Sequence, residues 1–285
     1  MNKTAFFTMD VECFREISCL REKPRAEYDN FRIEQVIDDY LDLLDRYGIK
    51  ATFFVLCSSL LHTKEFLLRA VQRGHEIALH GLTHDIPAEM DGEELKRQLR
   101  EGKALLEREL DTEVVGYRAP CFAVTDEVVD VLRDLGFLYD SSYLDIKLSY
   151  YRTAANFDGF ERVCDGILCK DGFYEISPCK VKTAFGTLSV SGGGYVRLAP
   201  YSTVRRGVKK FLKTSNYYMF YCHPADIFPQ RPPRLKGISP LNKFFIKAGR
   251  KRFLRRAEKI IKILVDNGYS FGTMRDFVRS KNEES

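Results

Sequence analysis

The sequence predicts an α/β fold built on a parallel sheet or barrel. Apolar, strand-like segments alternate with amphipathic helical segments through the first half of the chain, which is the pattern of a parallel sheet covered by helices. Three of the strand-like segments end in titratable residues. Because the active sites of α/β barrels lie at the carboxyl ends of their strands, we expect a functional site at one end of this fold.

The expected elements follow each other closely up to residue 142. The helix at 32–48 carries its apolar residues on one face and stops at Gly48, and a later helix begins at Thr125 as its cap and stops at Gly136. The expected strands and helices are, in order, 4–9, 32–48, 51–56, 64–74, 76–80, 93–110, 114–118, 125–136 and 137–142.

The alternation breaks at about residue 145. Residues 145–200 are rich in Gly, Tyr and Cys, so we expect a loop or hairpin insertion over the barrel mouth. At Gly192–Gly194 the backbone either approaches a substrate closely or makes a tight turn. A helix at 203–212 and a strand at 217–222 resume the pattern, and a helical extension is expected at 235–285. The prediction is one catalytic domain over 1–285.

The bulk composition is that of a globular protein. The chain has 285 residues, of which 45% are hydrophobic and 30% charged, enough for a full core. No apolar run is long enough to span a bilayer, and the N-terminus has no signal-peptide cleavage pattern. We therefore expect a cytoplasmic protein whose eight cysteines are free thiols. Cys164 and Cys169 read as hairpin positions, because a metal site would need a second close pair.

Positive charge is concentrated in one segment. Residues 243–262 contain nine Lys or Arg and one Glu. The helix expected there has an apolar stripe that would pack on the barrel, made of Phe253, Leu254, Ala257, Ile260, Ile261 and Leu264. The basic face is either simply solvated or contacts anionic lipid headgroups, each basic residue then contributing about 1 kcal/mol. Nucleic acid is not expected, because no aromatic residues interleave with the charges.

Two histidines and two acids form the strongest candidate site. His80 and His84 are four residues apart after an apolar run, a spacing that can bring both rings to one metal ion. Asp10 and Glu12 are alternate residues at the end of the first strand, so both can face the same mouth. One carboxylate would complete a two-histidine, one-acid site with open positions for water. Taken alone, the two acids could equally be loop caps.

Three further polar residues follow strand-like segments. Arg118 is either a surface residue or the partner of a buried carboxylate that it holds ionised. Asp140 could orient a histidine or cap its own turn. His223 precedes a proline, where an isolated histidine usually has a structural role.

In this order, the motifs resemble those of the polysaccharide deacetylases with the NodB homology domain, also known as family 4 carbohydrate esterases. The resemblance covers nearly the whole chain. A further segment, SVSGGGYVRLAPY, is similar to the subgroup associated with exopolysaccharide synthesis, which has its own C-terminal extension. The family implies a distorted (β/α)7 barrel that binds a divalent metal, usually zinc. The matching motifs are TMDVE, HGLTH, RAP, YDSS and CHP.

The resemblance also implies a role for each matching residue. Asp10 would be the general base, tethered by Arg118. His223 would be the general acid, tuned by Asp140. The implied metal ligands are Glu12, His80 and His84, although whether Asp10 or Glu12 binds the metal stays open.

The aromatic residues around the expected mouth are candidates for sugar binding. Relatives often have tryptophan after the HP motif, whereas this chain has Ala225 there and no tryptophan at all. The acetyl pocket or sugar platform must therefore be built differently. Phe122, Tyr143 and Tyr195 could stack on a sugar ring, or they could be ordinary core and loop residues.

The expected function is metal-dependent removal of N-acetyl groups from an amino-sugar glycan or glycan precursor in polysaccharide biosynthesis. This activity makes the chain a hydrolase of non-peptide carbon–nitrogen bonds. A lipid-linked saccharide would suit the basic segment, and the protein would then sit at the inner face of the membrane. Two rival interpretations are a related hydrolase of a small non-sugar amide and a non-catalytic barrel that binds glycan or a membrane surface.

Overall fold

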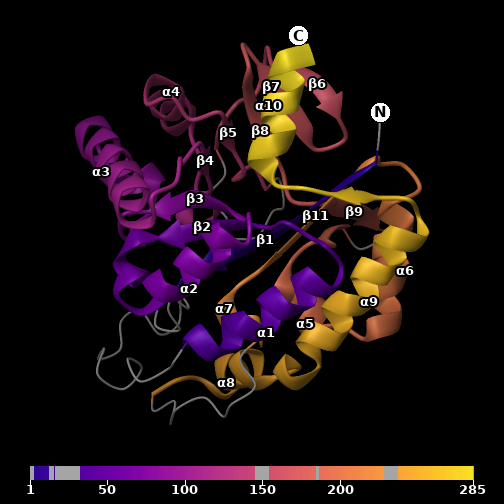
Figure 1. Cartoon of the computed structure of the whole chain (residues 1–285). Helices are drawn as coiled ribbons and strands as arrows, with labels where there is room; N and C mark the ends of the chain where they lie inside the picture. Colours follow the sequence, from indigo (N-terminus) through magenta and orange to yellow (C-terminus); the bar gives the residue numbers. More distant parts are fainter. Residues whose placement is uncertain are drawn as a thin grey trace.

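In this computed structural model, a mostly parallel sheet curls into a half-barrel with helices around it (Figure 1). The structure describes residues 3–12, 16, 33–144, 154–183, 186–227 and 237–284. Within these ranges the main path of the sheet has consecutive parallel strands in the order β11 (Tyr217–Cys222), β1 (Thr4–Val11), β2 (Thr52–Leu56), β3 (Glu76–Gly81), β4 (Gly116–Tyr117), β5 (Tyr139–Asp140) and β8 (Phe173–Ile176). The predicted fold class is confirmed.

The central strands are buried on both faces. Every residue of β2, β3 and β11 is buried, as are all but the first residue of β1. Such strands read as continuous apolar runs rather than as alternating patterns. The register pairs Met9 with Cys222, and Val55 with both Val11 and Leu79. The residues that directly follow these positions in β1, β3 and β11 therefore meet at one end of the sheet.

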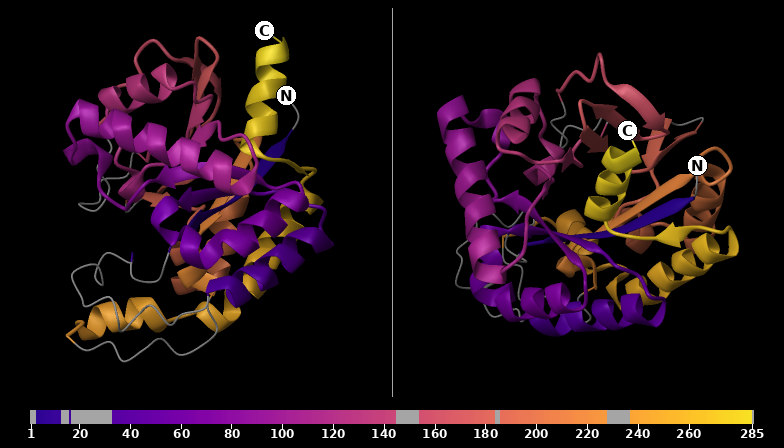
Figure 2. Two further views of the ribbon diagram at one scale, coloured as in Figure 1. Left: turned by 60° about the vertical axis from the view of Figure 1, so that its left-hand side comes forward. Right: turned by 45° about the horizontal axis from the view of Figure 1, so that its top comes forward.

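Helices cover the outside of the curled sheet (Figure 2). Thr125 caps α4 as expected, since its hydroxyl accepts a hydrogen bond from the Val128 amide at 3.3 Å. The longer helices are α1 (Ile33–Arg46), α2 (Leu60–Gln72), α3 (Gly92–Leu110), α4 (Asp126–Asp134), α6 (Tyr201–Phe211), α9 (Phe253–Asp266) and α10 (Met274–Glu284). The shorter ones are α5 (Gly193–Leu198), α7 (Pro224–Ile227) and α8 (Pro240–Lys247).

The segment 145–200 differs from its predicted form. It was expected as an insertion over the mouth, but it supplies β8, which pairs with β5 as part of the barrel wall. Its other strands are β6 (Glu161–Cys164) and β7 (Ile167–Lys170), which extend the same sheet, and β9 (Lys180–Thr183) and β10 (Gly186–Ser189), which form a separate hairpin. Residues 145–153 lie outside the described part of the chain.

The C-terminal segment packs on the barrel as predicted. Five residues of the expected stripe on α9 are buried, and Leu254 packs partly buried against the core. A short strand, β12 (Ser270–Phe271), pairs with the start of β1. The described cysteines, six in number, are free thiols. Among the described residues, no helix has the length and apolar character needed to cross a membrane.

His75 makes folding sensitive to acid. The His75 Nδ1 accepts a hydrogen bond from the Ala51 amide at 3.0 Å, which requires an unprotonated nitrogen. Burial, assisted by the charge of Lys50, lowers the pKa of His75 to about 4. As the pH falls below about 6.5, the unfolded chain protonates this imidazole before the folded chain does. Stability should therefore fall by about 3 kcal/mol between pH 6.5 and 4.

Urea unfolding at a series of pH values measures this contribution. The His75→Asn variant can keep an acceptor but has no imidazole to titrate. Its unfolding free energy should depend less steeply on pH over that window than that of the wild type. Identical slopes for the two proteins would contradict the assignment.

Candidate metal centre and active site

The carboxyl ends of β1 and β3 bring three potential metal ligands together. Glu12 follows β1, His80 lies in β3, and His84 lies in the turn after β3. The Glu12 Oε2 atom is 2.9 Å from His84 Nε2 and 3.8 Å from His80 Nε2. One donor atom from each residue lies within 4.8 Å of the others, and all three side chains are largely buried. Nitrogen and carboxylate donors in this combination suit zinc and similar divalent ions.

The His80 ring is oriented in the way that metal-binding histidines usually are. Its Nδ1 lies 2.7 Å from the carbonyl oxygen of Arg118. A carbonyl oxygen can only accept a hydrogen bond, so Nδ1 carries the hydrogen and the Nε2 of the neutral ring has a free lone pair. That nitrogen is the one that faces Glu12. The donor set therefore fits a divalent cation without rearrangement of the His80 ring.

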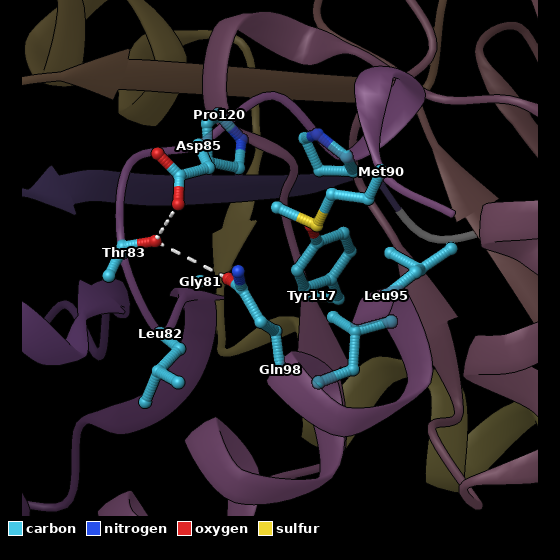
Figure 3. A pocket seen from close by; sticks show the side chains of 11 residues that line it. Gly81, Leu82, Thr83, Asp85, Met90, Leu95, Gln98, Tyr117 and Pro120 are labelled. Carbon is cyan, nitrogen blue, oxygen red and sulfur yellow. Dashed lines mark hydrogen bonds between the residues drawn. The ribbon is translucent and has the colours of Figure 1, made fainter. Parts of the chain in front are cut away.

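The chain between the two histidines makes a tight turn, and Figure 3 shows its residues Gly81, Leu82 and Thr83. Gly81 has a φ angle of +134°, and a Cβ atom there would lie 2.7 Å from the Thr83 carbonyl oxygen. The Thr83 hydroxyl bonds the Asp85 carboxylate at 2.6 Å and lies 3.4 Å from Gln98 Oε1. The cavity drawn in Figure 3 has a volume of about 10 Å³. It is too small for a sugar, so these residues support the turn that carries His84.

Arg118 is a buried partner of Asp10, as one of its two interpretations predicted. The Arg118 side chain is fully buried, and its Nη1 donates to Asp10 Oδ1 at 2.7 Å and to Thr8 Oγ1 at 2.9 Å. The Nη2 group donates to Ser141 Oγ at 2.8 Å, and the guanidinium lies 4.0 Å from the centre of the Phe54 ring. Arg118 therefore fixes the Asp10 carboxylate and compensates its charge.

His223, which directly follows β11, lies close to both Asp10 and Glu12. Its Nε2 lies 3.6 Å from Asp10 Oδ2 and 3.6 Å from Glu12 Oε1. Burial lowers the pKa of His223, but the bond with Asp226 and the charges of Glu12 and Asp10 raise it more, to about 9. In the absence of a metal ion, the ring is therefore protonated at neutral pH and can donate a proton.

The carboxylate beside His223 is Asp226, a residue that the sequence reasoning missed. Asp226 Oδ2 accepts a hydrogen bond from the His223 amide at 3.1 Å and lies 3.4 Å from His223 Nδ1. Arg197 Nε donates to Asp226 Oδ1 at 2.9 Å. Burial raises the pKa of Asp226, but His223 and Arg197 together lower it to about 2. The backbone of Gly193 lies close against the same carboxylate, so the Gly192–Gly194 segment approaches the protein's own side chain.

Asp140, which was predicted to tune His223, has its closest described partners in Ser142 and Glu175. The Ser142 hydroxyl donates to Asp140 Oδ1 at 2.5 Å, and the Asp140 carboxyl bonds that of Glu175 on β8. Burial raises the pKa of both carboxyls, and the charge of Asp140 raises that of Glu175 further. Two buried carboxyls in contact share one proton. Since Ser142 also accepts a bond from the Ala119 amide at 2.8 Å, this pair supports the segment next to Arg118.

The three predicted sugar-binding aromatics are separated. The centre of the Phe122 ring lies 5.7 Å from the Arg118 guanidinium carbon. Phe122 also packs edge-on against Tyr221, and the centres of the Tyr221 and His223 rings are 6.2 Å apart. Tyr143 instead lines a separate cavity of about 970 Å³ on the β6–β7 and β9–β10 side of the molecule. The Tyr195 hydroxyl donates to the Thr203 carbonyl at 3.1 Å, which directs the ring toward α6. Phe122 therefore lies next to a residue of the candidate centre.

Comparison with known proteins agrees with this geometry. Residues 27–139 match the polysaccharide deacetylase family model, and residues 149–279 match a model described as a domain of unknown function, DUF3473. A protein named peptidoglycan deacetylase-like protein FGM2, from Gibberella zeae, is 35% identical over 108 residues, which are 36% of this chain and 31% of that protein. The peptidoglycan-N-acetylglucosamine deacetylase PgdA of Listeria monocytogenes is 31% identical over 124 residues, which are 38% of this chain and 25% of PgdA.

The similarity in structure extends over the whole chain. A Mycobacterium smegmatis protein assigned to the polysaccharide deacetylases superposes with a TM-score of 0.65 at 18% identity, over 99% of this chain and 91% of the other. The fold is thus the barrel of the family 4 carbohydrate esterases. Residues 27–139 are similar in sequence to the polysaccharide deacetylases, and the whole chain is similar to them in fold. It spans less than a third of the length of the two curated relatives described above.

Proposed function

We propose that the protein is a metal-dependent hydrolase that removes N-acetyl groups from an amino-sugar glycan. The observation that carries the proposal is the convergence, at one end of the barrel, of a metal-type donor set with a general base and a general acid. Glu12, His80 and His84 would hold the cation, and zinc is the proposed ion. When bound, the ion would supply Lewis-acid polarisation of the acetyl carbonyl.

The remaining residues would carry out the proton transfers of amide hydrolysis. Asp10, held by Arg118, takes a proton from the attacking water. His223 donates its proton to the sugar nitrogen as the carbon–nitrogen bond breaks, so that the amine leaves as a neutral group rather than as an amide anion. The bond from Asp226 keeps the imidazole oriented for this transfer. Phe122 is proposed to contact the sugar or its acetyl group.

The proposed substrate is a lipid-linked glycan precursor of polysaccharide biosynthesis. The basic segment 243–262 would bring the protein to an anionic membrane surface from the cytoplasm. Support for this part comes from the charge of the segment and from the attraction of basic residues to anionic headgroups.

Metal analysis coupled to acetate release tests the proposal. The purified protein should contain one divalent ion per chain and release acetate from N-acetylglucosamine oligomers. His80→Ala should lose both the ion and turnover, whereas His62→Ala, a substitution outside the candidate centre, should lose neither. Full turnover by His80→Ala would overturn the mechanism. Acetate release from small acetamides alone would exclude the glycan substrate.

A further inference from the structure

Helix α8 presents large apolar side chains to solvent. Leu241, Phe244 and Phe245 are 63%, 60% and 43% exposed. Their spacing of three and four residues places them on one face of the helix, while Ile246 on the other face is buried. The Ser239 hydroxyl caps the helix by accepting a bond from the Asn242 amide at 3.2 Å. The folded helix therefore holds an apolar face outward.

The surroundings of this face are strongly positive. Residues 237–257 contain seven Lys or Arg and no Asp or Glu. Lys247, Lys251, Arg252 and Arg255 are exposed. A helix of this kind, with apolar side chains beside basic ones, is typical of segments that lie in the interface of anionic membranes.

A second copy of the chain is a poor occupant for the same face. A two-fold dimer through α8 would place the same surface on both sides of the interface. The basic residues of one copy would then lie against those of the other, with no acid from 237–257 to compensate them. An anionic lipid surface, in contrast, supplies the missing negative charge.

Hydrogen bonds through Arg197 connect the C-terminal end of α8 to the candidate active site. Arg197 Nη1 donates to the carbonyl oxygens of Phe245 at 2.5 Å and Ala248 at 2.6 Å. The same guanidinium holds Asp226, which in turn bonds His223. Figure 1 shows α8 at the same end of the molecule as α7, the helix that begins directly after His223. A surface that binds α8 therefore lies next to the proposed reaction centre.

We propose that α8 docks on an anionic lipid bilayer, with Leu241, Phe244 and Phe245 inserted among the headgroups. The basic residues that follow would contact the lipid phosphates. This assigns membrane contact to α8 and the turn after it, rather than to α9, whose apolar stripe is buried against the barrel. The role of this docking rests on the proposed function: it would bring a lipid-linked glycan to the active site.

Vesicle co-sedimentation with the full chain tests the docking. The probes are phosphatidylcholine vesicles with and without about one third phosphatidylglycerol. Wild type should bind the anionic vesicles at least tenfold more strongly than the neutral ones. Leu241→Ser/Phe244→Ser should weaken binding to anionic vesicles about tenfold or more, and Lys247→Gln/Lys251→Gln at least fivefold.

Matched variants separate this surface from general effects. Leu61→Ser/Val265→Ser removes two other exposed apolar residues, and Lys209→Gln/Lys213→Gln removes two other exposed charges. Both should bind vesicles like wild type. Equal binding by the α8 variants and wild type, or equal binding to neutral and anionic vesicles, would overturn the proposal. A dimer in solution that the Leu241→Ser/Phe244→Ser variant abolishes would assign the face to a second copy instead.

The same variants keep this proposal distinct from the proposed activity. Leu241→Ser/Phe244→Ser should retain wild-type acetate release from soluble oligosaccharides, because neither side chain belongs to the candidate centre. Vesicle binding without any deacetylation would overturn the enzymatic proposal and leave the docking surface standing.

Discussion

Replacing Arg118 with leucine should lower the free energy of unfolding by about 3 to 5 kcal/mol, because removal of one partner leaves a buried charge uncompensated. Asp10 is almost fully buried, and Arg118 provides its ion pair. The leucine would also leave Ser141 and Thr8 without the donors that they now have. Urea unfolding of the two proteins at one pH measures the difference.

Two additional variants distinguish the buried charge from lost packing. Arg118→Lys keeps the charge but cannot donate to Asp10, Thr8 and Ser141 together, so its loss should be smaller than that of the leucine variant. Arg118→Leu/Asp10→Asn removes both charges and should recover part of the stability. If Arg118→Leu unfolds at the same urea concentration as wild type, the ion pair with Asp10 does not stabilise the folded protein.

Replacing Asp10 with asparagine should lower kcat by about 100-fold to 10,000-fold, the range typical of a lost general base. The metal content should stay at the wild-type level, because the proposed ligands are Glu12, His80 and His84. Glu12→Gln should instead lose the metal. Measuring bound ion and kcat for both variants resolves which acid binds the metal. Loss of the ion from Asp10→Asn, with retention by Glu12→Gln, would reverse the two roles.

The sequence predicts the positions of the strand ends better than the contacts among them. Asp10, Glu12, His80 and His223 could all be placed at one end of a barrel, because each directly follows or ends an apolar run and parallel strands align their carboxyl ends. Which carboxylate lies beside which histidine depends on register and side-chain direction. These are set by the whole barrel, so the sequence alone did not place Asp226 beside His223 or Asp140 beside Glu175.

The sequence-based predictions were incomplete where the pattern that marks an element covers only a few residues. The strand β8 has four residues between a glycine turn and a Ser-Pro pair, inside a segment without alternating helices. Periodicity cannot reveal so short a buried strand. Glu175, which lies on it and bonds Asp140, was missed for the same reason. Asp226 follows Ala225, the residue at the position where relatives often have tryptophan, and only its contact with His223 reveals it.

The two regions matched by family models do not correspond to two structural units. Residues 27–139 contribute β2 to β4, and residues 149–279 contribute β8, β11 and β12 to the same hydrogen-bonded sheet. The proposed proton donor, His223, comes from the second region, and the metal-type histidines come from the first. The region described as a domain of unknown function thus completes the barrel that carries the candidate site, and a gene product that ended near residue 140 would lack both part of the barrel wall and the proposed proton donor.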